Sequence, residues 1–354
     1  MKGKCFNKIL TTCQVAISQT ERKPMGKTMK KIMTHTFTAA LLLLAANQTW
    51  AIDAPGRTEC IAPAKPGGGF DLTCKLLQVS LQETNAINKP MRVTYMPGGV
   101  GAVAYNAIVA QRPAEFGTVV AFSGGSLLNL SQGKFGRYNV NDVKWLAAIG
   151  TDYGAIAVRA DSPYKTLNDL MEAFKKDPNA VVFGAGASIG SQDWMKTALL
   201  AREVGIDPHK MRYVAFEGGG EPVTALLGNH IQAVSGDLSE MVPYLNGDKL
   251  RVLAVYAEQR LPGDLASVPT AKEQGYNLVW PIIRGFYMGP KVSEAEYQWW
   301  NDTFKKLVET EEFKKQRNLR GLFEFNLTGP ELDAYVKQQV NQYREMAKSF
   351  GLAK

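Results

Sequence analysis

Four glycine-rich turns, each directly after a short apolar run with β-strand character, constrain the fold of this chain more than any other feature. The turns lie at residues 66–71, 123–126, 184–191 and 217–222. Glycine lets a ligand approach the main chain without a Cβ in the way. Most of these turns lead into a helical pattern, and the N–H groups at a helix start favour negative charge. The pattern therefore predicts a site for a small anion.

Strand-like runs alternate with amphipathic helical stretches over most of the chain. The expected strands lie at 92–95, 118–122, 155–158, 181–183, 212–215, 231–234 and 251–256, and the expected helices at 73–82, 167–176, 194–204 and 222–227. This alternation predicts an α/β fold with a largely parallel sheet. Two capping boxes, Ser293 with Glu296 and Thr328 with Glu331, predict the starts of two C-terminal helices.

The basic charge of the chain is confined to its first 51 residues. The formal net charge is +8, but eight lysines and arginines stand against one glutamate in residues 1–51, which leaves 33 basic and 32 acidic residues beyond them. A body with almost no net charge lacks the electrostatic footprint of a nucleic-acid-binding protein. We therefore expect no nucleic-acid partner.

Residues 1–51 resemble a leader that contains a secretory signal starting at Met29. Lys30 and Lys31 form its charged region, 37–46 its apolar core and 49–51 a small-x-small cleavage site. The apolar core is too short to cross a bilayer as a helix. Residues 1–28 are expected to be an over-long reading of the gene, with a genuine extended leader as the alternative. A soluble periplasmic protein beginning near Ile52 is the expected product.

Cleavage of the leader would remove Cys5 and Cys13 and leave Cys60 and Cys74 in an oxidising compartment. A bridge between Cys60 and Cys74 would close a loop of about 15 residues around the first glycine turn and contribute roughly 3 kcal/mol. Two unpaired buried thiols are the alternative. A zinc site is disfavoured because only two histidines remain as soft partners, and we expect no metal.

The segment 186–190 matches the G-x-S-x-G nucleophile elbow, with Ser188 as the nucleophile. A serine hydrolase also needs a histidine base beyond the nucleophile, and the candidates His209 and His230 lie in a loop and a turn. The alternative is that Ser188 and Ser191 offer hydroxyl donors to a carboxylate at a helix start. We expect no enzyme, with a secreted serine esterase as the rival hypothesis.

Two further motifs are explained without chemistry. The run 99–104 reads G-x-G-x-x-A, but the following strand does not end in the acid that would hold a ribose, so we expect no cofactor and interpret the run as a tight turn with possible ligand contact. Asp237 and Glu240 are spaced as a helix cap and its third position, which requires no catalytic role.

Two cations flank the expected anion site. Arg284 lies inside the apolar run 280–286 and must reach a partner, because an unpaired buried charge is very costly. That partner is either a structural carboxylate or a ligand anion, and both remain open. Lys65 lies beside the first glycine turn, where it is either a solvated loop lysine or a ligand contact.

Four segments together resemble the extracytoplasmic solute receptors of tripartite tricarboxylate transporters. These are 62–71, 96–101, 216–222 and 268–273, and the likeness runs from about residue 58 to the end. The resemblance implies a two-lobed periplasmic binding fold of type II-like architecture, with a mostly parallel sheet and flanking helices in each lobe and a ligand cleft between the lobes. The chain would cross between lobes near 150–154 and 256–263, giving a discontinuous lobe of 52–155 with 258–354 and a second lobe of 156–257.

The resemblance also implies a function and a set of ligand contacts. Such a receptor is a monomer that closes on a small carboxylate and delivers it to two integral membrane subunits. Relatives often carry an aromatic residue where Arg284 stands, so the extra cation favours a tricarboxylate, either citrate or tricarballylate. A receptor for an amino acid or an aromatic acid is a weaker alternative within the same class. The residues expected to contact it are Lys65, Pro66, Gly67, Gly68, Gly69, Phe70, Ser123, Gly125, Ser126, Gly186, Ser188, Ile189, Gly190, Ser191, Gln192, Gly218, Gly219 and Arg284.

Overall fold

The computed structural model describes residues 52–245, 247 and 249–353, and the expected leader at 1–51 lies outside them. The strands are β1 (Glu59–Ala62), β2 (Arg92–Tyr95), β3 (Thr118–Ser123), β4 (Lys144–Arg159), β5 (Val182–Gly186), β6 (Arg212–Phe216), β7 (Ala233–Asp237), β8 (Leu250–Val255), β9 (Pro281–Met288) and β10 (Phe323–Thr328). The α-helices are α2 (Gly69–Glu83), α3 (Ala102–Ala110), α4 (Gly124–Ser131), α5 (Leu167–Lys176), α6 (Gln192–Glu203), α7 (Gly220–Leu227), α8 (Leu238–Leu245), α9 (Glu294–Glu309), α10 (Glu311–Leu319) and α11 (Gly329–Ser349). None of the helices in this described part has the length and apolar content needed to cross a membrane.

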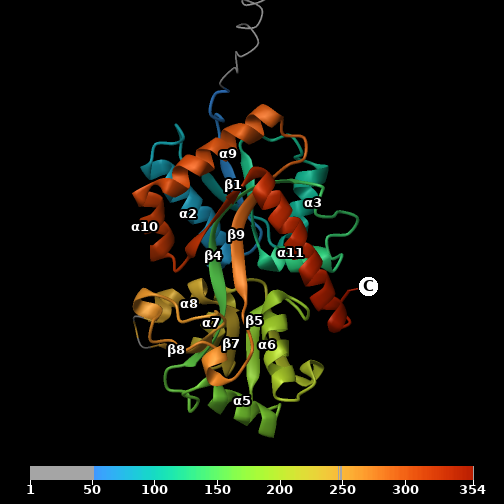
Figure 1. Ribbon diagram of the computed structural model, residues 1–354, viewed down its shortest axis with the longest axis vertical. Coiled ribbons are helices and arrows are strands. Elements are labelled where there is room, and N and C mark those ends of the chain that lie inside the picture. The colour runs from blue at the N-terminus through green and yellow to red at the C-terminus, as the bar shows by residue number, and fades with distance from the viewer. Residues whose placement is uncertain (1–51, 246, 248, 354) are drawn as a thin grey trace, which may run out of the picture. The chain divides into compact units, whose positions relative to one another are not determined.

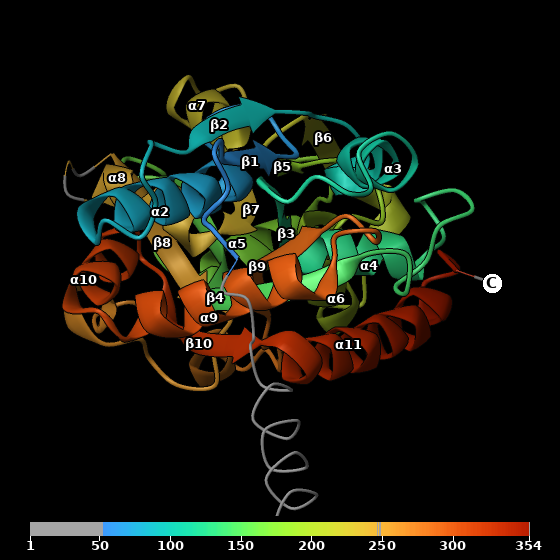
Figure 2. The ribbon, with the colours of Figure 1, turned by 90° about the horizontal axis from the view of Figure 1, so that it is seen from above.

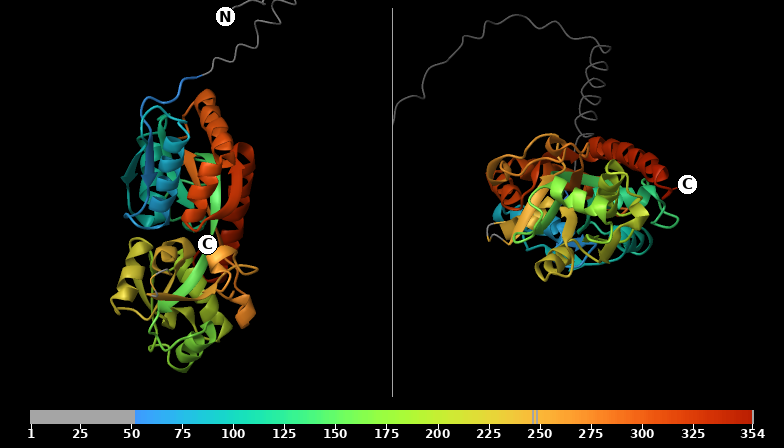
Figure 3. Two further views of the ribbon diagram at one scale, coloured as in Figure 1. Left: turned by 90° about the vertical axis from the view of Figure 1, so that its left-hand side faces the viewer. Right: turned by 90° about the horizontal axis from the view of Figure 1, so that it is seen from below.

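The strands form two groups that are joined through the long strand β4 (Figure 1). In one group, β2, β1, β3 and β9 follow one another, and β9 and β10 pair with β4. In the other group, β4 pairs with β7 and β8, and β5 and β6 extend the sheet beyond β7. Helices flank both groups, which gives the expected two-lobed α/β architecture, and Figure 3 shows the two lobes one above the other.

The sheets are mixed rather than largely parallel. The pairs β1–β2, β1–β3, β5–β6 and β5–β7 are parallel, whereas every pairing of β4 and β9 is antiparallel. Strands joined by a crossover helix run parallel, but β4 and β9 run between the lobes in opposite directions and lie side by side. The parallel arrangement predicted from the alternation of strands and helices is therefore confined to the outer strands of each lobe.

Local sequence signals decided several element boundaries. The expected helix 167–176 is α5 itself, because Thr166 and Asp169 cap its first turn reciprocally. The predicted capping box of Ser293 and Glu296 begins α9. The box predicted at Thr328 is wrong, since its side chain makes no cap hydrogen bond; Pro330 in the first turn removes one of the N–H groups that such a cap would accept.

Helices from the C-terminal part of the chain tie the molecule together. Helices α2 and α9 share one core cluster, which includes Leu76 and Trp300, whereas α4 and α11 share another, which includes Leu127 and Val336. Seen from above, α2 and α11 lie well apart (Figure 2). Trp300 of α9 is fully buried and donates a hydrogen bond to the carbonyl of Phe116. After α11, the Phe350 ring packs against Trp194 of α6, which belongs to the opposite lobe. The C-terminal segment therefore braces one lobe against the other.

The limits of the two lobes follow the strand pairing. The pairing of β4 passes from β9 to β7 between Tyr153 and Gly154, inside the expected crossing at 150–154. The second expected crossing, at 256–263, fits less well. Leu261 and Leu265 would lie beyond the crossing or at its end, yet they pack in the same core cluster as Val252, which belongs to β8 of the second lobe. We therefore propose that the second crossing lies at the start of β9, and the lobe limits 52–155, 156–257 and 258–354 stay a prediction.

The predicted disulfide is confirmed. Cys60 in β1 and Cys74 in α2 are bonded, with their Cα atoms 5.6 Å apart, and both side chains are fully buried. The two residues are 14 positions apart, so the bridge closes a loop that contains the first glycine turn. The disulfide therefore ties together β1 and α2, the two elements on either side of this turn.

Replacing both Cys60 and Cys74 by serine is expected to lower the free energy of unfolding by roughly 3 kcal/mol, because the unfolded chain regains the entropy of the open loop. Urea unfolding followed by circular dichroism measures this difference. The wild-type protein treated with a reductant serves as the matched control and should lose about as much. A loss below about 1 kcal/mol in both would contradict the expected contribution.

Candidate functional site

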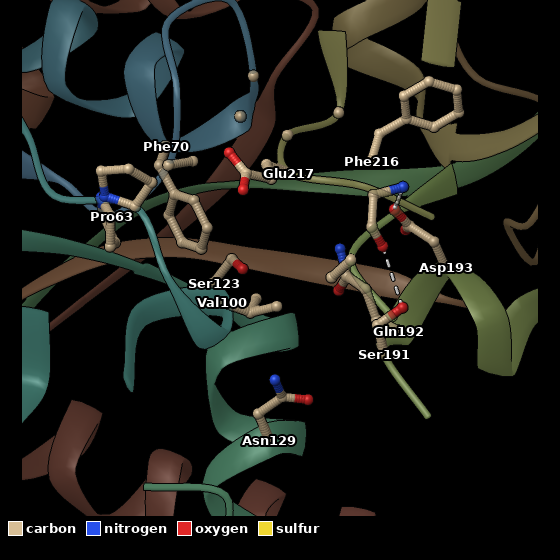
Figure 4. A pocket seen from close by; sticks show the side chains of 18 of the residues that line it. Pro63, Phe70, Val100, Ser123, Asn129, Ser191, Gln192, Asp193, Phe216 and Glu217 are labelled. Carbon is tan, nitrogen blue, oxygen red and sulfur yellow. Dashed lines mark hydrogen bonds between the residues drawn. The ribbon is translucent and has the colours of Figure 1, made fainter. Parts of the chain in front are cut away.

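A cavity of about 450 Å³ lies where the turns after β1, β3, β5 and β6 meet (Figure 4). β1 and β3 belong to one sheet, and β5 and β6 belong to the other. Ligands of α/β proteins bind in crevices at the carboxyl ends of strands, and cavities of this size suit a small molecule. The cavity between the two lobes is therefore the candidate ligand site.

The structure brings most of the residues predicted for the site to this cavity. Its wall includes Gly68, Gly69, Phe70, Ser123, Gly186, Ser188, Ser191, Gln192, Gly218, Gly219 and Arg284. The other predicted residues are not part of the wall: Lys65, Pro66, Gly67, Gly125, Ser126, Ile189 and Gly190. Ser126 is buried inside the start of α4, and Ile189 is 52% exposed. Contact with a ligand stays a prediction for all of them.

Sequence reasoning missed a second set of wall residues. These are Pro63, Ala64, Pro97, Gly98, Gly99, Val100, Asn129, Lys134, Ala187, Asp193, Ala215, Phe216, Glu217, Asp237 and Glu240. The run 97–100 overlaps the 99–104 motif that was interpreted as a tight turn with possible ligand contact, so the sequence did carry a signal for Gly99 and Val100. Asn129 and Lys134 follow the second glycine turn by one and two helical turns and gave no signal of their own.

Arg284 is held by two buried carboxylates. Its Nη2 donates to Asp152 Oδ2 at 2.8 Å and to Asp237 Oδ2 at 2.7 Å, and the exposed fraction of Arg284 is only 2%. Asp152 belongs to β4, Asp237 ends β7 and Arg284 belongs to β9, so the ion pairs lie where the lobes join. Of the two partners left open by the sequence, the structural carboxylate is the one that the structure shows.

A second buried cation, Lys196 of α6, extends this cluster. Its Nζ lies 2.7 Å from Asp193 Oδ1 and 3.0 Å from Asp237 Oδ1, and it donates to the carbonyl of Gly236 at 2.7 Å. Burial by itself would raise the pKa of Asp237, but Lys196 and Arg284 outweigh burial and hold that pKa below its usual value. Asp237 is therefore an ionised bridge between the two cations. Its interpretation as a simple helix cap is not what the structure shows.

Glu240 of α8 reaches across to the first glycine turn. Its Oε1 accepts a hydrogen bond of 2.8 Å from the Gly69 N–H at the start of α2. Burial, together with the negative charges of Asp237 and Asp193, raises the pKa of Glu240 to about 8. Burial also raises the pKa of Asp193 to about 6. Near neutral pH, Glu240 is therefore mainly protonated.

Acidic groups outnumber basic groups around this cavity. The ionisable residues of its described wall are Asp193, Glu217, Asp237, Glu240, Lys134 and Arg284. Both buried cations of the cluster are shared between carboxylates, and each additional carboxylate raises the pKa of its neighbours. The charged side chains of the wall therefore do not form a basic patch.

Several main-chain amides that were expected to hold an anion already have protein partners. The Gly67 N–H donates to Asp71 Oδ2 at 2.8 Å, and the Gly69 N–H donates to Glu240. In the third turn, the Gly186 N–H donates to Asp193 Oδ2 at 3.0 Å. The amides of these three glycines are therefore engaged by carboxylates of the protein itself, which leaves a ligand fewer donors than the sequence suggested.

Lys65 closes the rim of the cleft without lining it. Its Nζ lies 2.8 Å from Glu217 Oε2 and 3.0 Å from Glu221 Oε1, both on the turn of the opposite lobe. All three side chains are exposed, and solvent screens exposed ion pairs, so these contribute little to stability. These ion pairs therefore connect the two lobes at the rim of the cleft.

The described wall of the cavity offers no histidine base for Ser188, which the serine-nucleophile hypothesis requires. Ser188 lies on the wall and is exposed, while the Ser191 hydroxyl donates to the carbonyl of Gly186 and accepts from the N–H of Trp194. Among the described wall residues there is no histidine. The described residues also contain no cluster of histidine, cysteine or acidic side chains arranged to hold a metal ion.

Comparisons with known proteins agree on one family. A profile described as "Tripartite tricarboxylate transporter family receptor" matches residues 77–352. The "UPF0065 protein in gbd 5'region" of Cupriavidus necator is 24% identical over 81% of this chain and 85% of its own length. The structure of the periplasmic binding protein BugD has a TM-score of 0.75 at 20% identity, covering 85% of this chain and 100% of that one. MatC of Rhodopseudomonas palustris with bound malate has a TM-score of 0.72 at 20% identity, covering 82% and 99%.

Replacing Arg284 by glutamine is expected to lower the free energy of unfolding by about 3–5 kcal/mol, because Asp152 and Asp237 would be left buried without their cation. Urea unfolding measures the loss. The change of Lys134 to glutamine removes an exposed cation from the same wall and should cost less than about 0.5 kcal/mol. Adding Asp152→Asn to the Arg284→Gln variant should recover part of the stability, and a loss below about 1 kcal/mol would show that the cluster matters little.

Glu240 is expected to make stability fall as the pH rises between about 5 and 8. Its carboxyl holds a proton in the folded state up to a pKa of about 8, whereas the ordinary value is 4.5, so the unfolded state binds fewer protons in this interval. Urea unfolding at pH 5, 6.5 and 8 should show a steeper decline for the wild type than for Glu240→Gln. The variant Glu217→Gln, at the exposed rim, should follow the wild type. Parallel profiles for the wild type and Glu240→Gln would contradict the expectation.

Proposed function

The chain belongs to the tripartite tricarboxylate transporter receptor family, and from this we propose that it captures a small carboxylate in the cavity between its lobes and delivers it to the membrane subunits of such a transporter. The observation that supports this most directly is the cavity of about 450 Å³ built by turns from both sheets. A wall shared by two lobes suits a ligand that is enclosed when the lobes come together.

Receptors of this family bind solutes rather than transform them, and this chain is a receptor and not an enzyme. Ser188 is accordingly a wall residue and a possible hydroxyl donor to the ligand. The esterase hypothesis has no further support in the geometry, since the serine lacks the base and orienting acid that activate such a nucleophile. The proposal therefore needs only binding, release and docking on membrane partners.

We propose hinge closure as the mode of capture. β4 and β9 cross between the lobes side by side, and the change of pairing partner between Tyr153 and Gly154 gives β4 a natural place to bend. The contacts that join the lobes across the cleft include the Lys65 ion pairs, the Gly69–Glu240 hydrogen bond and the hydrogen bond from Gln132 Nε2 to the carbonyl of Gly190. These contacts would break on opening and re-form on closure.

Citrate or tricarballylate stays a prediction whose main support has weakened. The argument for a third carboxylate rested on Arg284 as an extra cation, and Arg284 is balanced by Asp152 and Asp237. The structural neighbour MatC, described with bound malate, shows that this fold can hold a smaller acid with two carboxylates. We therefore propose a carboxylate with fewer than three negative charges.

A thermal-shift panel of mono-, di- and tricarboxylates tests the proposed function on the purified protein. The true ligand at about 100 times its dissociation constant should add about 2.7 kcal/mol of stability, because it binds the folded state alone. Esters of the same acids serve as controls and should produce no shift. A flat response to every carboxylate would overturn the proposed function, and a response to tricarboxylates alone would restore citrate or tricarballylate as the ligand.

A further inference from the structure

The cluster where the lobes join contains more acidic than basic groups. Its cations and acids are Lys196, Arg284, Asp152, Asp193, Asp237 and Glu240. All of them are at most 6% exposed except Glu240, which is partly buried. Four carboxylates against two cations leave two negative charges unbalanced if every group is ionised, and an unbalanced buried charge is very costly. At least one of the four carboxyls therefore holds a proton in this arrangement.

The contacts of the four acids identify Glu240 as the one that holds the proton. A cation nitrogen lies 2.8 Å from Asp152, 2.7 Å from Asp193 and 2.7 Å from Asp237. Glu240 has no lysine or arginine partner among the described residues, and its protein donor is the N–H of Gly69. Burial favours the neutral form most strongly in a carboxyl that no cation compensates.

The charged groups around Glu240 act in the same direction. Burial raises the pKa of Glu240, and Asp237 of β7 and Asp193 of α6 raise it further. Arg284 of β9 lowers this pKa only in part, because two other carboxylates share that cation. At the rim, Lys65 is paired with the two exposed glutamates of the fourth turn. The surroundings thus supply no free cation to keep Glu240 ionised.

The hydrogen bond of Glu240 crosses between the lobes, so the proton is needed when the lobes are in contact. Gly69 begins α2, which follows β1 of one sheet, whereas Glu240 lies in α8, which follows β7 of the other. A Cβ on Gly68 would stand 3.5 Å from Glu240 Oε1, so the first glycine turn covers the carboxyl directly. Water replaces this turn when the lobes separate, and a hydrated carboxyl ionises readily.

We propose that the protein takes up one proton, on Glu240, with each carboxylate that it captures, and gives the proton up when the lobes open to release the carboxylate. This inference rests on the proposed receptor function and adds a second cargo to it. The proton comes from the surrounding water and adds to a carboxylate oxygen of Glu240, and no other bond forms or breaks. Because Glu240 lies on the cavity wall, its protonated form offers an O–H donor instead of a negative charge to an anionic ligand.

Isothermal titration at pH 7 in phosphate and in Tris, two buffers of different ionisation enthalpy, measures the protons that binding takes up. The probes are lactate, succinate, malate and adipate, which cover one and two negative charges and are almost fully ionised at this pH. We expect between about 0.5 and 1 proton per bound acid, because Glu240 is mainly protonated at pH 7 in the closed arrangement and ionised in water.

Two outcomes of this titration would overturn the inference. Binding without proton uptake would do so while leaving the receptor function intact. Binding of none of the four acids would do so as well, because no capture would then exist for the proton to accompany. The wider carboxylate panel decides the receptor function separately.

The variant Glu240→Gln tests the residue. Glutamine keeps an oxygen for the Gly69 N–H but cannot take up the proton, so uptake should fall below about 0.2 proton per bound acid. The affinity of the wild type should fall at least about fivefold between pH 6 and pH 7.5, whereas that of the variant should change less than about twofold over the same interval.

Glu221→Gln is the matched control. Glu221 also contacts the opposite lobe, through Lys65, but it is exposed and is not among the residues of the described cavity wall. Lys65 holds the pKa of Glu221 below its usual value, so this acid stays ionised and its variant should keep the proton uptake and pH dependence of the wild type. Uptake that survives in Glu240→Gln, or an equal loss in Glu221→Gln, would remove Glu240 as the proton site.

Discussion

The buried ion pairs of Arg284 with Asp152 and Asp237 are the interaction on which the two-lobed structure depends. They join β9, β4 and β7 where the chain passes between the lobes, and solvent screens the charges little because all three side chains are almost fully buried. Burying such a charge is costly, and removing any one member leaves the others uncompensated. The cluster therefore fixes the geometry of the junction, and with it the relative positions of the turns that build the cavity.

The same side chains explain why the turns are rich in glycine. A Cβ on Gly69 would lie 2.2 Å from Arg284 Nη1, and a Cβ on Gly219 would meet the Glu240 carboxylate. Glycine is needed at these positions because a charged side chain of the protein packs on the backbone, whatever ligand is bound. The glycine-rich turns thus locate the site correctly, while the amides they expose serve partly as anchors for the protein's own carboxylates.

Features that depend on residues close together in the chain could be predicted from the sequence, whereas contacts between distant residues could not. The capping residues around Thr166 set α5 correctly, the spacing of Cys60 and Cys74 in a chain expected to be exported predicted the disulfide, and the four turns located the cavity and supplied part of its wall. Partners far apart in the chain leave no such pattern. Arg284 lies 132 positions from Asp152, and Glu240 lies 171 positions from Gly69. The spacing of Asp237 and Glu240 therefore suggested only a local helix cap, whereas the structure shows long-range contacts for both residues.

Lobe closure and the charge of the cleft are physically coupled through Glu240. Its hydrogen bond to Gly69 joins the lobes, so opening of the proposed hinge would return this carboxyl to water, where its pKa falls toward the usual value and it ionises. Closure then has to offset a negative charge, either by taking up a proton or by enclosing a positive group. A ligand without a positive group leaves only the first route, so closure on such a ligand is accompanied by protonation of Glu240. The electrostatics of closure thus couple the capture of a ligand to the protonation state of Glu240.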